Sequence, residues 1–210
     1  GAMVMSEWSG GYVSELGYTF GYYEALSTSR IDFCMLNQGL APPKISRARE
    51  LGFGQGLYIN IHAAATDVAW TGTDFNPVQA NFARQLAKSS GADIHLYDSS
   101  FEELLHKADL PTFQYIGLHG IWSWISDKNR QAVVEIIRDR LEVGGVVYMS
   151  YNTLPGWSGF APMRDLMKRH SEILAGSGAG VLSGIEGAFG FAQQLLDLKP
   201  KYLLANPQMK

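Results

Sequence analysis

The stretch Glu50-Leu51-Gly52-Phe53-Gly54-Gln55-Gly56 places three glycines at alternate positions, between a predicted strand over 47–51 and a predicted helix over 56–65. Glycine allows a tight turn and lets backbone N–H groups approach a ligand at the N-terminus of the following helix. The spacing differs from the G-x-G-x-x-G pattern of dinucleotide-binding proteins and from the G-x-x-x-x-G-K-[ST] loop of nucleotide triphosphatases. The stretch therefore predicts a ligand-binding turn, although a glycine-rich turn alone does not identify the ligand.

Short apolar runs alternate with amphipathic stretches after this turn. We predict further strands over 68–73, 93–97, 114–118 and 145–150, and helices over 77–88 and 127–141. The run over 145–150 is nearly all apolar, which is typical of a strand covered on both faces. Strands separated by helices predict an α/β fold, a Rossmann-like doubly wound sheet that is mostly parallel.

The segments outside this alternation are predicted to be irregular or helical. Gly1-Ala2-Met3 are interpreted as an expression scar, and residues 4–43 as an aromatic N-terminal cap. Residues 44–152 form the predicted core, and residues 153–210 a helical C-terminal segment. In that segment we expect a helix to about residue 174, a glycine-rich joint over 176–190 and a short helix ending near residue 198.

Two acidic residues follow strands of the predicted sheet. Asp74 ends the second strand, where an acid accepts hydrogen bonds from both ribose hydroxyls in doubly wound folds; the alternative is a helix N-cap ahead of Pro77. Asp98 follows the third strand, where an acid or its polar neighbour can meet the exocyclic amine of an adenine. The alternative there is a plain cap or turn residue. Ligands of open α/β sheets bind at the carboxyl ends of the strands, so the glycine turn and both acids predict one shared site.

The composition narrows the class of protein. Lys and Arg number 17 against 20 Asp and Glu, a net charge of -3 without a dense basic block, which argues against a nucleic-acid partner. Cys34 is the only cysteine and no two histidines have metal-ligand spacing, so we expect no disulfide and no metal site. No apolar run approaches the length of a membrane span, and we predict a cytoplasmic protein.

The motifs together resemble those of class I S-adenosylmethionine-dependent methyltransferases. Residues 50–56 are similar to the first motif of that class, Asp74 to its ribose-binding acid, and Tyr97-Asp98-Ser99 to the segment beside the adenine. Residues 113–119 resemble the fourth strand, and Leu141-Glu142-Val143-Gly144-Gly145 resembles the Leu-x-Pro-Gly-Gly turn before the fifth. The resemblance implies S-adenosylmethionine as cofactor, bound by Glu50, Gly52, Gly54, Gly56, Asp74, Phe75, Asp98, Ser99, His119 and Trp122.

A narrower resemblance is to bacterial methyltransferases that carry a methyltransferase regulatory domain, a group that includes rickettsial protein-lysine methyltransferases. It lies in residues 18–23, 117–124 and 151–157. The sixth and seventh strands of the class and the regulatory domain are not recognisable in the sequence. We therefore expect the chain to be the catalytic part of a longer protein, with a truncated C-terminal segment.

The residues of the acceptor side are predicted from their places after the strands. His119 follows the fourth strand, where a histidine can orient the acceptor or take up its proton near neutral pH; the alternative is a histidine that holds the loop. Trp122 is expected to line the cofactor pocket or to pack in the core. Tyr18, Tyr22 and Tyr23 are predicted to form an aromatic lid or to fasten the N-terminal segment to the sheet. Asn152 and Trp157 are predicted to line the acceptor side.

The preferred hypothesis is an S-adenosylmethionine-dependent methyltransferase that acts on a nitrogen or oxygen of a protein side chain or a small molecule. The absence of Asn-Pro-Pro-Tyr after the fourth strand disfavours amino methylation of DNA bases. One alternative is a non-catalytic domain that binds S-adenosylmethionine or S-adenosylhomocysteine, and a second is an NAD-dependent oxidoreductase. An open sheet edge would favour a homodimer.

Overall fold

The computed structural model describes residues 21–175 and 181–207, which divide into two compact units, one ending at Tyr151 and the other beginning at Asn152. The first unit contains a parallel sheet in the order β3-β2-β1-β4-β5. Its strands are β1 (Arg47–Leu51), β2 (Ala69–Asp74), β3 (Ile94–Asp98), β4 (Phe113–Leu118) and β5 (Leu141–Met149). This topology confirms the predicted Rossmann-like α/β class.

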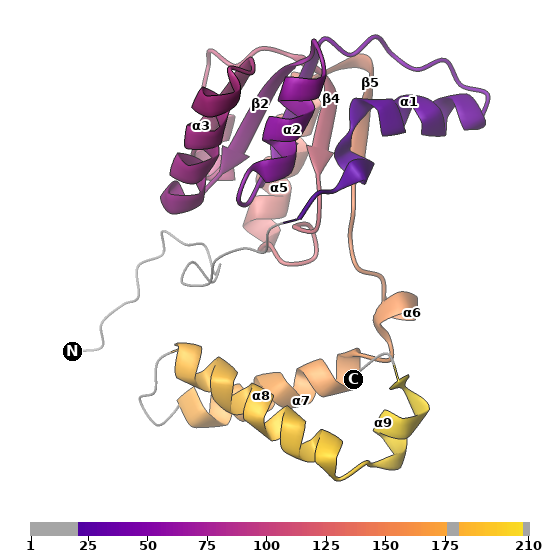
Figure 1. Cartoon of the computed structure of the whole chain (residues 1–210), viewed down its shortest axis with the longest axis vertical. Helices are drawn as coiled ribbons and strands as arrows, with labels where there is room; N and C mark the ends of the chain where they lie inside the picture. Colours follow the sequence, from indigo (N-terminus) through magenta and orange to yellow (C-terminus); the bar gives the residue numbers. More distant parts are fainter. Residues whose placement is uncertain (1–20, 176–180, 208–210) are drawn as a thin grey trace. The chain divides into compact units, whose positions relative to one another are not determined.

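Helices cover both faces of the sheet. In Figure 1, α2 (Leu57–Ala65) and α3 (Pro77–Ser90) lie in front of it and α5 (Asp127–Arg140) lies behind. The front face buries an apolar cluster that includes Ile59, Trp70 and Tyr115, with Ile31 from α1 (Thr28–Asn37). A second cluster joins the sheet to α5 and to the short helix α4 (Phe101–Leu105). Two separate cores on one sheet are expected when amphipathic helices cross over between parallel strands.

The helices of this unit begin at side-chain caps that the sequence carries. Asn76 caps α3, accepting from the amide of Val78 at 3.0 Å, with Pro77 in the first turn. Ser100 and Glu103 form a complete capping box at α4. Ser126 caps α5, accepting from the amide of Asn129. Each cap satisfies amide donors that have no partner inside the helix, and so sets where the chain leaves the strand end and turns into the helix.

Strand β5 differs from its prediction in two ways. It begins at Leu141, and Gly144-Gly145 form an irregularity inside the strand rather than a turn before it, because the pairing passes from Phe113↔Leu141 to Tyr115↔Val146. Gly144 has φ +84°, which only glycine adopts readily. The strand is also not covered on both faces, since its residues are half-buried or exposed. It is the last strand in the sheet order, and the described residues after it contain no further strand.

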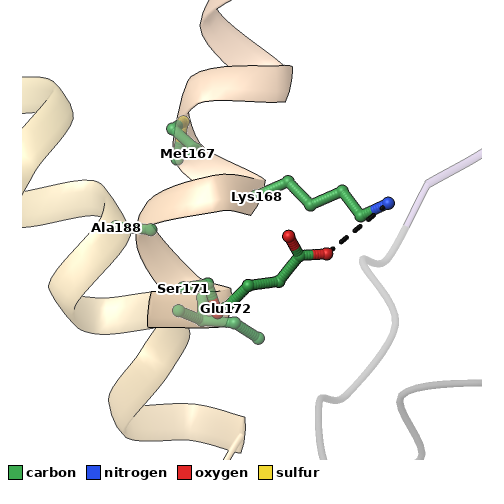
Figure 2. Close-up of a pocket in the computed structure, with 6 residues that line it drawn as sticks. Met167, Lys168, Ser171, Glu172 and Ala188 are labelled. Atoms are coloured by element: carbon green, nitrogen blue, oxygen red, sulfur yellow. Dashed lines mark ion pairs between the residues drawn. The ribbon is translucent and has the colours of Figure 1, made fainter. Parts of the chain in front are cut away.

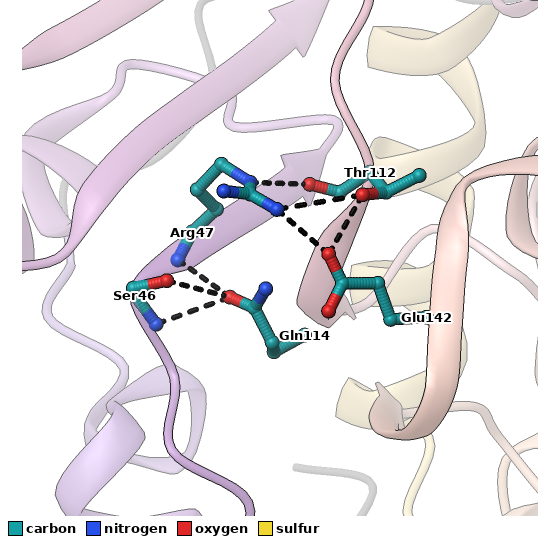
Figure 3. A network of polar contacts seen from close by, with 5 residues as sticks. All are labelled: Ser46, Arg47, Thr112, Gln114 and Glu142. Atoms are coloured by element: carbon teal, nitrogen blue, oxygen red, sulfur yellow. Dashed lines mark hydrogen bonds and ion pairs between the residues drawn. The ribbon is translucent and has the colours of Figure 1, made fainter.

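The N-terminal ends of three strands are joined by a polar network, shown in Figure 3. The guanidinium of Arg47 donates to the carbonyl of Thr112 at 2.7 Å and to the carboxylate of Glu142 at 2.7 Å. The amide oxygen of Gln114 accepts from the backbone amides of Ser46 and Arg47, at 3.1 and 2.8 Å. The network lies at the end of the sheet opposite the glycine turn, where it holds β1, β4 and β5 together.

The second unit is helical, with α6 (Leu154–Trp157), α7 (Ala161–Ala175), α8 (Val181–Asp197) and α9 (Lys201–Ala205). The prediction of a glycine-rich joint over 176–190 is wrong from residue 181 onward, because Gly184 and Gly190 lie inside α8. A Cβ on Gly184 would come within 2.8 Å of the hydroxyl of Ser171. Glycine is therefore used there to let α8 pack closely on α7, not to break the helix.

A pocket of about 410 Å³ lies between α7 and α8, lined by Met167, Lys168, Ser171, Glu172, Ile185 and Ala188. Figure 2 shows its two charged side chains, Lys168 and Glu172, paired with each other at 3.7 Å. The other lining groups are mostly apolar, so the pocket presents little that would orient a polar ligand.

None of the described helices has the length and apolar character needed to cross a membrane.

Candidate functional site

The turn after β1 is built from glycines with left-handed backbone. Gly52, Gly54 and Gly56 have φ of +76°, +57° and +71°. The amide of Gly52 donates to the carbonyl of Thr73 at 2.7 Å, which holds the turn against the end of β2. A Cβ on Gly56 would stand 2.4 Å from the Cβ of Ala83 in α3. Backbone strain and close packing thus both require glycine, and the turn leads directly into the N-terminus of α2.

Asp74, the last residue of β2, connects this turn to the start of α3. Its carboxylate accepts from the amides of Gly54 at 2.8 Å and Asn76 at 3.0 Å. The side chain is buried, and this burial raises the pKa of Asp74 to about 6, while the two hydrogen bonds act in the opposite direction. The alternative interpretation of Asp74 as the helix N-cap is wrong, because Asn76 fills that position.

Glu50 lies one residue before the end of β1, paired with Gly72 on one side and Gly117 on the other. It is fully buried, and neither carboxylate oxygen makes a hydrogen bond of standard geometry to the described residues. Burial raises the pKa of Glu50 well above its usual range; the hydroxyl of Tyr58 nearby lowers it, a weaker effect. A buried carboxyl with open acceptor positions is costly unless a donor from a ligand or water reaches it.

The ends of β2 and β3 place two acids in register, since Asp74 pairs with Asp98. Asp98 is exposed and lies 3.4 Å from the guanidinium of Arg84 in α3, and this hydrogen bond lowers the pKa of Asp98. Its interpretation as a helix cap is wrong, because Ser100 caps α4. Phe75 and Ser99, next to the two acids, are half-buried. These residues form one edge of the site.

His119 follows β4 on the other side of the glycine turn. Its Nδ1 lies 3.0 Å from the hydroxyl of Tyr148 in β5, with the two rings nearly parallel. The ring of Tyr23 packs on the imidazole, with centroids 4.3 Å apart. The imidazole is half-buried, which lowers the pKa of His119 and favours its neutral form. A neutral imidazole can accept a proton.

Trp122 and Tyr22 lie farther from this group. Trp122 packs against the cluster of α4 and α5, and the guanidinium of Arg130 lies 5.8 Å from the centroid of its ring. These contacts are those of a packing residue at the margin of the site. Tyr22 is 52% exposed and its ring faces His62, with centroids 5.5 Å apart. Its predicted role on the acceptor side stays a prediction.

Comparison with known proteins indicates the family to which the site belongs. Residues 49–145 match the family model of a methyltransferase domain. An uncharacterised protein of Synechocystis sp. is 41% identical over 208 residues, which are 97% of this chain and 40% of the relative. An uncharacterised protein of Rickettsia prowazekii is 29% identical over 138 residues, 64% of this chain and 54% of the relative. The chain thus spans about half or less of the length of these relatives.

Among solved structures, PKMT2 from Rickettsia typhi in complex with AdoHcy is similar, with a TM-score of 0.65 and 24% identity over 74% of this chain and 30% of that chain. Residues 49–145 thus match a methyltransferase domain, and the fold around them is that of class I methyltransferases. This confirms the predicted class and, with it, the methyl donor that the class uses, S-adenosylmethionine. The glycine turn of the methyltransferase domain, its two acids and His119 all lie within or beside the matched residues.

The geometry of the methyltransferase domain fits this cofactor. Asp74 keeps acceptor capacity for ribose hydroxyls beyond its two backbone bonds, since a carboxylate can accept about four hydrogen bonds. Glu50 has acceptor positions that the described residues leave open, and a cation such as an ammonium group would favour its ionised form. The three left-handed glycines carry no side chains of their own, so their backbone is not shielded by a Cβ. These residues fit the ribose and the amino-acid part of S-adenosylmethionine.

Three predicted acceptor-side residues lie outside the part of the first unit that the structure describes. Tyr18 lies outside the described residues. Asn152 and Trp157 belong to the second unit, so their role stays a prediction. Sequence reasoning missed Tyr58 and Tyr148 as members of the site. The position of Tyr58 in the first turn of α2 could have signalled it, whereas Tyr148 depends on the register Gly117↔Tyr148 between β4 and β5.

Proposed function

We propose that this chain binds S-adenosylmethionine and transfers its methyl group to a nitrogen or oxygen of a protein side chain or a small molecule. The observation that carries the proposal is the buried Asp74, held at the glycine turn by the amide of Gly54 and next to Asp98 in register. The match to the methyltransferase family model over residues 49–145 supports it. The similarity to PKMT2, whose solved complex contains AdoHcy, adds support from the fold.

In this proposal the domain binds the donor and takes up the acceptor's proton. S-adenosylmethionine, when bound, supplies a methyl group on a positively charged sulfur, which leaves as a neutral thioether when the acceptor's lone pair takes the methyl group. Asp74 holds the ribose hydroxyls and Glu50 accepts from the ammonium group. His119, neutral and bonded through Nδ1 to Tyr148, uses Nε2 to take the proton that an N–H or O–H acceptor loses.

The first test is calorimetric titration of the chain with S-adenosylmethionine, S-adenosylhomocysteine and NAD. We expect micromolar binding of the first two and none of NAD. Binding of NAD alone would revive the oxidoreductase alternative. No binding of either S-adenosylmethionine or S-adenosylhomocysteine would contradict the assignment of the glycine turn.

The second test is turnover. Radiolabelled S-adenosylmethionine is incubated with the chain and a bacterial extract, and label is measured separately in protein and in low-molecular-mass compounds. We expect label in one of these fractions with the wild type and at least about tenfold less with His119→Gln, since general-base catalysis contributes on the order of 10²–10⁴. Tight binding without any transfer would favour the non-catalytic alternative.

The remaining predictions about partners and location belong to this proposal. We expect a protein or small-molecule acceptor, no nucleic-acid partner and a cytoplasmic location. β5 is paired on one side only within the described sheet, so an unpaired edge is available to a second copy of the chain. Sedimentation equilibrium of the wild type would show a dimer if this edge is used in that way.

A further inference from the structure

The segment before α1 is attached to β4 through Leu26. Leu26, in the short helix η2 (Glu24–Leu26), is fully buried, and its carbonyl accepts from the hydroxyl of Tyr115 at 3.1 Å. Its side chain fills the space beside Gly117, where a Cβ would lie 2.8 Å from the Leu26 Cδ2. Leu26 is thus packed closely against Gly117 and bonded to Tyr115, and these contacts hold the segment beside β4.

Tyr23, three residues earlier, lies between two rings of the site. Its ring meets that of Tyr58 edge-on, with centroids 5.2 Å apart and planes at 76°. On its other side it lies against the imidazole of His119, with centroids 4.3 Å apart and planes at 32°. Tyr58 is buried in the first turn of α2, so it provides a fixed support on one side of the Tyr23 ring. The contact with Tyr58 is at a distance typical of favourable aromatic pairs, and the contact with His119 is slightly closer.

The imidazole of His119 is therefore held by two different elements. The hydroxyl of Tyr148 in β5 lies 3.0 Å from Nδ1, and the two ring planes are 5° apart. This single contact does not by itself stop the imidazole from rotating about its side-chain bonds. Tyr23 covers one ring face and limits that rotation. Among the described residues, the ionisable groups that face the imidazole in these contacts are the two phenols of Tyr23 and Tyr148. A base must keep its orientation within narrow limits to accept a proton from a bound substrate.

We propose that Tyr23 is a positioning residue for His119: packed between Tyr58 and the imidazole, it holds the ring in the orientation that keeps Nδ1 on Tyr148 and Nε2 available. The inference rests on the proposed role of His119 as the base. The simpler alternative is that Tyr23 only fastens the N-terminal segment to the domain. The two differ in what happens to His119 when the segment stays attached through Leu26 but the Tyr23 ring is changed.

The test uses the full chain labelled with ¹⁵N and ¹³C in histidine, with the His119 signals assigned from the variant His119→Gln. Tyr23→Leu removes the ring, Tyr23→Phe keeps the ring and removes the hydroxyl, and Tyr22→Leu is the matched control in the same segment. For the wild type and Tyr23→Phe we expect one tautomer of His119 and a titration midpoint below the ordinary value. For Tyr23→Leu we expect mixed tautomers and a midpoint shifted upward by at least about half a pH unit, because the ring face becomes solvated.

Turnover separates positioning from attachment. In the assay with radiolabelled S-adenosylmethionine and extract, we expect Tyr23→Leu to lower the rate of methyl transfer at least about tenfold. The dissociation constant of S-adenosylhomocysteine should stay within about threefold of the wild-type value. An unchanged His119 spectrum in Tyr23→Leu, or an equal change in Tyr22→Leu, would overturn the inference. If the wild type binds no S-adenosylhomocysteine, the proposed function fails, whereas the dependence of the His119 tautomer on Tyr23 is still measured.

Discussion

The carboxylate of Asp74 accepts a hydrogen bond of 2.8 Å from the amide of Gly54, so the end of β2 holds the turn that follows β1. The same carboxylate is the group proposed to bind the ribose. Because it is buried, its pKa is raised to about 6. The structure of the turn and the proposed binding of the cofactor therefore depend on one carboxyl group with a pKa of about 6.

Cofactor binding is expected to weaken in mild acid. Below a pH of about 6, Asp74 takes up a proton in the free chain and loses acceptor capacity, so the affinity for S-adenosylhomocysteine should fall as the pH drops from 7.5 to 5. Asp74→Asn should weaken binding at pH 7.5 about 10- to 100-fold, since hydrogen bonds to a charged group contribute about 1.5–3 kcal/mol. It should also remove most of this pH dependence. Calorimetric titration measures both.

The control is Asp139→Asn, an exposed position in α5 that should leave binding unchanged.

The stability of the fold should change with pH in the opposite direction to binding. Asp74 has a raised pKa in the folded state, so the folded chain binds more protons between a pH of about 4 and 6 and the free energy of unfolding falls as the pH rises through this window. A pH-independent affinity of the wild type would contradict the ribose assignment.

Gly56→Ala should destabilise the domain strongly. The new Cβ would lie 2.4 Å from the Cβ of Ala83 at a backbone φ of +71°. Gly91→Ala has nearly the same φ, +67°, but nothing within 4 Å of the new Cβ. We expect Gly91→Ala to cost about 1 kcal/mol from backbone strain and Gly56→Ala about 2–4 kcal/mol, because overpacking is added to it. Urea unfolding measures both, and equal losses would show that α3 moves freely away from the turn.

Arg49→Met is expected to raise the free energy of unfolding, by about 1 kcal/mol. Arg49 is fully buried in β1, and burial lowers its pKa to about 10. Its Nη2 donates to the hydroxyl of Thr73 at 2.9 Å, but Nε and Nη1 have no hydrogen-bonding partner among the described residues. Removing an incompletely paired buried charge is favourable when an apolar side chain of similar volume replaces it. A loss of stability in urea unfolding would show that the guanidinium is solvated in the fold.

Glu142→Gln should lower stability at neutral pH and reduce the sensitivity of the fold to acid. Hydrogen bonds from Thr112, then Gln114 and Arg47, lower the pKa of Glu142 in the folded state. A carboxyl with a lowered pKa contributes stability above its unfolded pKa of about 4.3 and loses it as the pH falls through the folded value. Thermal unfolding of the wild type and the variant between pH 7 and 3 measures the difference. If the unfolding temperatures of the wild type and the variant change equally with pH over this range, the prediction is contradicted.

Much of the fold followed from local patterns. Alternating apolar runs and amphipathic stretches predicted all five strands to within a few residues, except for the start of β5. The glycine turn and Asp74 were predicted from their order along the chain. These features depend on residues close together in sequence, where spacing and backbone preference decide the conformation.

The errors lie where long-range packing overrides local preference. Gly184 reads locally as a break, but the close approach of α8 to Ser171 makes glycine the residue that permits the helix contact. The run over 145–150 reads as a fully covered strand, yet β5 is the last in the sheet order and stays partly exposed. Apolar composition indicates a strand, but its place in the sheet decides how much of it is covered.

The amino-acid sequence was sufficient to determine the class of fold, the glycine turn and the acid that ends β2, because each is encoded by neighbouring residues whose spacing suits one backbone geometry. Only the tertiary structure decided that Asp74 bonds to Gly54, that Glu50 is fully buried, and that Tyr23 lies against His119. These residues are far apart in the chain. Their meeting depends on strand order, register and side-chain packing, which form only when the whole sheet is assembled.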